Sequence, residues 1–397
     1  MAQTSAEQMR AWQGPALFSF GFRPFFLFGA IWVVLAMGLW LVALSGAIDL
    51  PSRMDRVSWH AHEFLFGYLG AVLAGFLLTA VPNWTGRLPM VGWRLAALFG
   101  LWVAGRIAIL FSAALPVAVA PVIDLAFPLV LGGLILREIV AGKNWRNLIV
   151  LALLAVFALA NALFHYEAVT GGYAAQGVGL RLGVATAVMM ICVIGGRIIP
   201  SFTRNWLARQ DNPARPAPPM QRFDKIVLLF SIPVLLAWVV NPFDVYIGVA
   251  LVVFAVLHLA RQSRWQAHHT LSEPLVWVLH VSYVFIPLGA LALGLDQILG
   301  NPGTAGAQHL WMTGAIGAMT LAVMTRATLG HTGQALTASP MTVVIYLCLF
   351  GSVLARFWTS LFLELSYVSG VLWVLAFAGF AVAYGPSLLR QKPEKPA

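Results

Sequence analysis

Long apolar stretches recur along almost the whole of this 397-residue chain. A stretch of about 20 apolar residues crosses a bilayer as a helix, because lipid offers no hydrogen-bond partner to a free backbone amide. The sequence therefore predicts an all-α, polytopic membrane helix bundle. About twelve transmembrane helices are expected, with these approximate limits: Phe25 to Ser45, Trp59 to Val81, Trp93 to Phe111, Leu115 to Val140, Leu148 to His165, Gly177 to Pro200, Phe223 to Val240, Phe243 to Gln262, Glu273 to Leu295, Ala307 to Leu329, Met341 to Thr359 and Leu361 to Tyr384.

The composition supports this interpretation and excludes others. Charged residues make up 10% of the chain and hydrophobic residues 60%, whereas soluble domains carry about 25% charged residues. A soluble enzyme, a disordered chain and a disulfide scaffold are excluded on these grounds. The net charge of +10 predicts anionic membrane lipid as the partner, and no nucleic acid, because the basic residues can be assigned to loops.

The distribution of basic residues predicts the topology. Short cytoplasmic loops are enriched in Lys and Arg. With the N-terminus in the cytoplasm, all but five of the 24 basic residues fall on the cytoplasmic side, and the other side keeps Arg53, Arg56, Arg106, Arg181 and Arg356. We expect an even number of spans and both the N- and C-termini in the cytoplasm.

The longest polar segment suggests a division of the chain. Residues 204–222 are rich in Pro and Arg and predict a cytoplasmic linker. It would join a first six-helix half, residues 1–203, to a second six-helix half, residues 223–397. A faint internal echo at the ends of helices two, six and ten, residues 81–85, 199–203 and 328–332, would instead suit three four-helix units.

The strongest chemical signal is the run Trp59-His60-Ala61-His62-Glu63 at the start of the second span. Helical residues two apart point about 200° away from each other, whereas residues three apart share a face. His60 and His62 should therefore serve two metal sites on opposite sides of the helix. Glu63 shares a face with His60, and we expect it to act catalytically as a proton relay. The alternative is that the motif only marks the membrane interface.

Haem suits these histidines better than zinc, because imidazole is a usual axial ligand of haem iron. A small-residue face that includes Gly67 and Gly70 would let a flat macrocycle, or a neighbouring helix, approach closely. The second axial ligand is expected from His309 or His165, each near the outer end of its span. We expect one or two haems, of b-type, with copper as a further metal.

Other polar residues are weaker candidates. His280 lies three residues before Tyr283 on one helix, so the two could form a second polar site, with a simple core hydrogen bond as the alternative. At the inner face, arginines at helix ends could hold haem propionates, or could instead reach lipid phosphate. These inner-face candidates are Arg23, Arg197 and Arg326, with His331 nearby as a possible metal ligand. His258, His268 and His269 are interpreted as interfacial residues.

Arg106 and Asp124 lie nine residues on either side of Leu115, the expected turn between spans three and four. An antiparallel hairpin would place the two side chains level, about 13 Å from the turn at 1.5 Å per residue. Neither charge is stable alone in lipid, so we predict a buried ion pair.

Four long motifs resemble the NnrS family, and the resemblance spans nearly the whole chain. It implies a multi-pass bacterial inner-membrane protein that contains haem and copper and is linked to nitric oxide and nitrosative-stress defence. The motifs are FGFRPFF at residues 20–26, WHAHEF at 59–64, GFLLTAVPNWTG at 75–86 and MTRATLGHTG at 324–333.

Three functions are compatible with these observations. The first is a nitric oxide reductase-like oxidoreductase that couples two NO into N2O, with an electron donor that the sequence does not identify. The second is an NO-binding, sensing or iron-protecting protein without turnover. The third is a proton-coupled transporter with histidine relays. The oligomeric state is left open.

Overall fold

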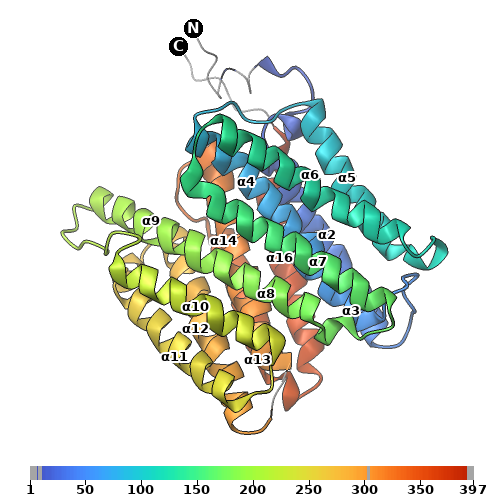
Figure 1. Cartoon of the computed structure of the whole chain (residues 1–397). Coiled ribbons are helices and arrows are strands. Elements are labelled where there is room, and N and C mark those ends of the chain that lie inside the picture. The colour runs from blue at the N-terminus through green and yellow to red at the C-terminus, as the bar shows by residue number, and fades with distance from the viewer. Residues whose placement is uncertain (1–6, 8–10, 302–304, 391–397) are drawn as a thin grey trace. The chain divides into compact units, whose positions relative to one another are not determined.

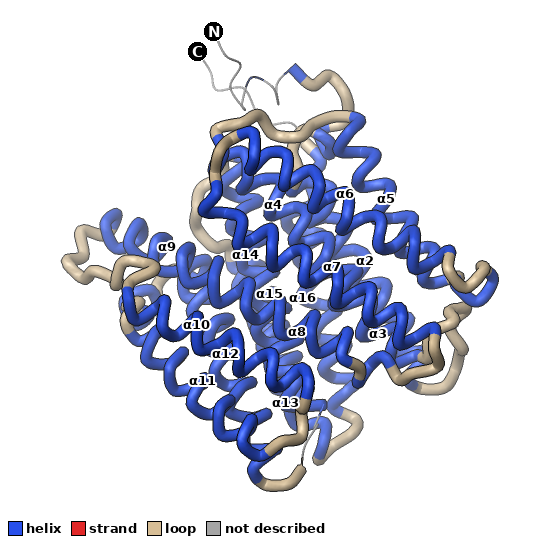
Figure 2. Tube along the Cα trace, in the orientation of Figure 1, coloured by secondary structure: helices blue, strands red, loops and turns tan. Residues whose placement is uncertain are grey.

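The computed structural model describes residues 7, 11–301 and 305–390. Over these residues the regular structure is helical, and Figure 2 shows helices joined by loops with no strand in the described part of the chain. Eleven helical stretches there are long and apolar enough to cross a membrane. The predicted all-α, multi-pass membrane fold is confirmed, whereas the cytoplasmic position of both termini stays a prediction.

The eleven stretches match the expected spans to within a few residues, except that the sixth runs nine residues further. The α labels are those of Figures 1 and 2. The stretches before residue 210 are α2 (Phe22–Leu44); α3 (Arg56–His62), η2 (Glu63–Tyr68) and α4 (Leu69–Thr85) in one stretch; α5 (Trp93–Leu110); α6 (Val119–Ala141); η4 (Trp145–Asn147) with α7 (Leu148–Val169); and α8 (Val178–Met190), η6 (Ile191–Gly195) and α9 (Gly196–Arg209) in one stretch. The later stretches are α10 (Arg222–Val240); α11 (Val245–Ser263); α12 (Pro274–Ile298); α15 (Pro340–Phe357) with η9 (Trp358–Ser360); and α16 (Leu365–Leu389). Short 3-10 turns are η1 (Ala16–Phe18), η3 (Ser112–Ala114), η5 (Ala174–Gln176) and η7 (Ala267–Thr270).

The expected span from Ala307 to Leu329 is also helical. It is built from α13 (Ala305–His309), η8 (Leu310–Gly317) and α14 (Ala318–Thr332). It is not among the eleven, because its Gly and Thr residues and Arg326 lower the mean hydropathy.

Polar side chains fix where several helices begin. Asp55 accepts hydrogen bonds from the backbone amides of Val57 and Ser58, at 3.0 Å each, and so caps the helix that carries the His-x-His-Glu motif. Asp244 caps α11 in the same way. The second span ends at Thr85, and the next residue, Gly86, caps it with a φ of +67°, which favours glycine. The caps place the ends of these helices at defined residues.

The chain divides by its contacts into two compact units. Unit 1 holds the described residues up to Gly183, with Ala327–Ala335 and those from Phe377 onward; unit 2 holds Val184–Arg326 and Leu336–Ala376. Three helices, α8, α14 and α16, contribute residues to both units. The division into halves at residues 204–222 stays a prediction.

Within unit 1 the second span packs against α2 and α6, and α5 forms a hairpin with α6. Helices α4, α6 and α7 lie side by side in Figure 1. This arrangement brings residues from spans that are distant in sequence to one buried region of unit 1.

Three spans contain a π-helical segment: η2 in the second, η6 in the sixth and η8 in the tenth. These are the same three spans whose ends share the sequence echo. In the second and tenth spans the π segment begins immediately after a histidine, His62 or His309, and contains a glycine five residues beyond it. π segments widen a helix by one residue and are frequent at functional sites.

Arg23 holds the end of α16 within unit 1. Its Nη1 donates to the backbone oxygens of Leu388 at 2.9 Å and Arg390 at 2.7 Å. The last carbonyls of a helix have no partner inside the helix, so a guanidinium that reaches them acts as a cap. Arg23 is buried, and its contacts in the structure are those of a structural residue.

We predict that Arg23→Gln lowers the free energy of unfolding by about 1.5–3 kcal/mol, the usual contribution of a hydrogen bond to a charged group. Thermal unfolding of the detergent-solubilised protein, followed by tryptophan fluorescence, measures this. The exposed Arg94 offers a matched control, because Arg94→Gln should leave the melting temperature unchanged. Equal melting temperatures for both variants would refute the capping role.

Candidate metal centre

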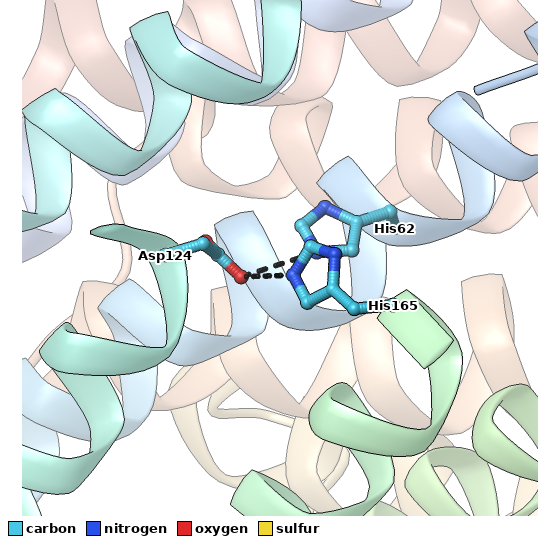
Figure 3. A group of neighbouring side chains, drawn as sticks. All are labelled: His62, Asp124 and His165. Carbon is cyan, nitrogen blue, oxygen red and sulfur yellow. Dashed lines mark hydrogen bonds and ion pairs between the residues drawn. The ribbon is translucent and has the colours of Figure 1, made fainter. Parts of the chain in front are cut away.

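Three potential metal ligands meet in the core of unit 1: His62, Asp124 and His165 (Figure 3). One ligand atom from each lies within 4.8 Å of the other two, and all three side chains are buried. Asp124 Oδ2 is 2.9 Å from His165 Nε2 and 3.2 Å from His62 Nε2. Two imidazoles and one carboxylate form a donor set that binds transition-metal ions.

Each ligand comes from a different span. His62 is the last residue of α3, Asp124 lies in the first half of α6 and His165 lies near the end of α7. Because spans two and four are held together by helix packing, and α6 and α7 form the next neighbouring pair, the three side chains converge. His165 was predicted as a metal ligand, whereas Asp124 was predicted only as an ion-pair partner.

The predicted ion pair is confirmed and is larger than expected. Arg106 Nη2 contacts Asp124 Oδ1, and Arg106 Nη1 donates to Glu63 Oε1 at 2.6 Å. Asn161 Nδ2 donates to Asp124 Oδ2 at 2.7 Å. Arg106 therefore joins both carboxylates, and Asn161 fixes the second oxygen of Asp124.

Glu63 orients His62. His62 Nδ1 lies 2.9 Å from Glu63 Oε1 and donates to this carboxylate, and Nε2 faces Asp124 Oδ2 at 3.2 Å. A carboxylate behind an imidazole fixes the tautomer in many metal sites. The other oxygen of Glu63 accepts a hydrogen bond from Trp32 Nε1 at 2.8 Å.

With both histidines neutral, this cluster needs one more positive charge. Glu63 and Asp124 carry two negative charges and Arg106 carries one positive charge, so the buried group has a net charge of −1 when both histidines are neutral. Nε2 of His62 faces two acceptors, Asp124 Oδ2 and, at 3.1 Å, Asn161 Oδ1. A proton or a metal ion at Nε2 resolves both problems, and the donor set fits a metal ion.

Glu63 begins the π segment, and its carboxylate contacts both His62 and Arg106. The same carboxylate also reaches Trp32 of α2, the helix whose Trp40 stacks on His60. Gly67 leaves the room for the guanidinium, because a Cβ there would lie 2.4 Å from Arg106 Nη1. The carbonyl of Gly67 accepts a hydrogen bond from Trp102.

His60 lies in a different environment from His62, as the helical spacing predicted. Its ring stacks on Trp40 with centroids 4.4 Å apart, and it contacts Phe64 at the same centroid distance. The two histidines therefore do not share one site.

Haem does not fit at His62 in this arrangement. An axial ligand offers one ring nitrogen to the iron and leaves space beside its ring for the porphyrin. The rings of Phe66, Phe164 and His165 pack around the ring of His62, with centroids 5.5, 5.5 and 4.8 Å away, and leave no space for a porphyrin beside it. Gly67 belongs to the small-residue face that was predicted to accommodate a macrocycle, but the space beside it is occupied by the guanidinium of Arg106. Haem at other histidines stays a prediction.

The remaining predicted site residues lie outside this cluster. His331 belongs to unit 1 and packs against Phe20 and Phe22, with ring centroids 5.5 Å away. In unit 2, His309 Nδ1 is 2.6 Å from the carbonyl of Ala305. Their assignment as metal ligands stays a prediction.

Of the predicted arginines, Arg326 is buried beneath Phe202, with its guanidinium carbon 4.2 Å from the ring centroid. Arg197 is half-buried in α9. Their proposed contact with haem propionates also stays a prediction.

Unit 2 contains a second buried polar network that the sequence interpretation mostly missed. His258, interpreted as interfacial, is buried, and its Nδ1 is 2.8 Å from Tyr283 Oη. Arg261 donates to Tyr283 Oη at 3.0 Å and to Asp224 at 2.8 Å. His280 does not join Tyr283, since its Nε2 lies 2.8 Å from Thr203 Oγ1. The signal available in the sequence was that apolar residues flank His258 on both sides, at 251–257 and 259–260, which places it inside a span and not in a basic loop.

Together, the fold and the cluster define a multi-pass membrane protein with a buried His/Asp/His group inside its helices. A family model described as "NnrS protein" matches residues 16–392. The chain belongs to the NnrS family, and membership points to a membrane protein related to nitric oxide. No curated protein matches the chain.

Arg106 should be the most sensitive residue of the cluster. We predict that Arg106→Met lowers the free energy of unfolding by about 3–5 kcal/mol, because it leaves two buried carboxylates without their cation. Asp124→Asn should cost less, since Glu63 still neutralises Arg106. Denaturant unfolding in mild detergent measures both.

The surface pair Arg87 and Glu138 provides the control for this prediction. Arg87 is 45% exposed, and an exposed ion pair contributes about 0–1 kcal/mol. If Arg87→Met lowers the free energy of unfolding as much as Arg106→Met does, the buried network contributes no more to stability than an exposed ion pair.

Proposed function

We propose that this protein binds a redox-active transition-metal ion, copper in our assignment, at His62, Asp124 and His165, and that this centre handles nitric oxide. The observation that carries the proposal is the fully buried group of two imidazoles and one carboxylate, whose ligand atoms lie within 4.8 Å of one another. Buried ionisable groups in membrane spans are costly, and they commonly mark a functional site. The bacterial inner membrane is the proposed location.

The donor set supports copper over harder cations. Imidazole nitrogen suits copper, zinc, iron and nickel, whereas magnesium and calcium prefer oxygen ligands alone. Copper is also the metal ion that the family resemblance implies beside haem. When bound, it would supply a site for NO and a one-electron redox couple.

The finer proposal is reductive turnover of NO to N2O. Coupling two NO consumes two electrons and two protons and releases one N2O and one water. Glu63 is 0% exposed and contacts a proposed ligand, so we assign it to hold a proton beside the centre. Arg106 keeps Asp124 and Glu63 apart and oriented, and the apolar surroundings exclude bulk water. The electrons come from a donor that is still to be identified.

A second candidate is NO binding without turnover, as in a sensor or in protection of cellular iron. The closed network around Glu63 favours it. The two oxygens of Glu63 accept from His62, Trp32 and Arg106. A carboxylate that accepts from three donors can take up a proton only at the cost of some of those hydrogen bonds.

The metal assignment predicts a selective loss of binding. His62→Ala and His165→Ala should each lose one bound copper ion, because each removes a ligand of the same site. His60→Ala is the matched control, since His60 lies two residues away in different surroundings. Copper-loaded, desalted protein is analysed by inductively coupled plasma mass spectrometry, with melting temperatures to verify folding. Loss in His60→Ala together with full copper in His62→Ala would exclude the assignment.

Turnover is tested separately. Membranes that contain the wild-type protein should produce N2O from NO with a chemical reductant. Glu63→Gln should slow this by about 10²–10⁴-fold, the usual contribution of a positioned proton donor, with copper content unchanged.

Glu364→Gln, which changes an exposed carboxylate, should behave as wild type. Absence of N2O from wild-type protein that holds copper would favour binding without turnover.

A further inference from the structure

A narrow pocket in unit 1 leads to the candidate metal centre. It lies between the second span, α6 and α7, and Asp124 and Asn161 form its polar end. Its volume is about 10 Å³, which is space for about one water-sized molecule. The pocket therefore reaches a proposed metal ligand directly but admits only a very small molecule.

The remaining walls of the pocket are apolar. They are formed by Phe66, Gly70, Phe127, Pro128, Leu131, Leu154 and Phe157. A water molecule needs two to four polar partners to be stable in a cavity, and small apolar cavities stay dry. Apart from Asp124 and Asn161, the walls offer no polar side chain and favour a small uncharged molecule over an ion.

Two residues create this space. Pro128 lies inside α6 and has no backbone N–H, so the carbonyl four residues earlier, that of Asp124, receives no helical hydrogen bond from it. The helix therefore lacks one backbone hydrogen bond at the proposed metal ligand. Gly70 contributes to the space of the pocket because it has no side chain, whereas a Cβ at this position would lie 3.9 Å from the ring of Phe127.

The outside of α6 at this level is made for lipid. Pro128 is half-buried, and the next two residues, Leu129 and Val130, are 64% and 46% exposed. Exposed apolar side chains on a membrane span face the hydrocarbon, where uncharged gases are soluble. The rim of the pocket is therefore next to a source of such molecules that requires no aqueous channel.

We propose that this pocket is a binding site and entry route for a diatomic or linear triatomic uncharged gas, which passes from the bilayer between α6 and α7 to Asp124. The inference rests on the proposed function for what happens to the gas at the centre, whereas the pocket itself requires no metal. Size selects against larger solutes, and the apolar walls select against charged ones.

Krypton is a suitable probe, because it is uncharged, chemically inert and visible by anomalous scattering. Crystals of the metal-free wild-type protein under krypton pressure should show an atom in the pocket. Gly70→Leu, whose side chain fills the space, should lose that peak. Gly133→Leu, on the outer part of α6 where a Cβ meets nothing within 4 Å, should keep it.

Gly70→Ala guards against misfolding of the larger variant, because its Cβ makes only an ordinary contact at 3.9 Å, and it should lower the krypton occupancy. A wild-type pocket without krypton, or equal occupancy in Gly70→Leu, would overturn the proposal. Copper binding is unaffected by these outcomes. Conversely, krypton in the pocket of a protein that binds no copper would keep the pocket and refute the proposed function.

Discussion

The organisation of unit 1 depends on the cost of placing charge inside a lipid-embedded bundle. Asp124, Glu63 and Arg106 are all buried, and none is stable there alone. Each needs a partner from another span, so the network dictates which helices meet and at what depth. Gly67, which makes room for the guanidinium, and Asn161, which donates to Oδ2 of Asp124, follow from the same requirement.

Much of this could be predicted from the sequence. Apolar length predicted the spans, and equal spacing from the turn at Leu115 predicted the pairing of Arg106 with Asp124, because helical rise is constant. The alternation of His60 and His62 correctly separated their environments. These inferences need only local geometry, which a single sequence contains.

What could not be predicted depends on packing between distant spans. His165 was one of two histidines expected to supply a second ligand, but its choice over His309, and the addition of Asp124 as a third ligand, depend on how distant spans pack. The contact of Glu63 with Arg106 likewise joins two spans that lie about forty residues apart. His258 in unit 2 was misplaced for a related reason, since its partner Tyr283 lies on another helix.

The site and the pocket form one coherent design. A buried centre suits a substrate that dissolves in lipid, and Pro128 removes one backbone hydrogen bond of α6 at Asp124, the ligand that this substrate would approach. Membership of the NnrS family agrees with a nitric oxide substrate. The ion-pair network that joins the helices of unit 1 also holds the residues of the proposed metal centre in place.

X-ray absorption at the copper edge of the purified, copper-loaded protein tests the central claim most directly. The account predicts two imidazole nitrogens and a carboxylate oxygen at about 2.0–2.2 Å, with outer-shell scattering typical of histidine. Copper bound by sulfur, or by a set without imidazole, would contradict the claim that His62, Asp124 and His165 form a metal centre.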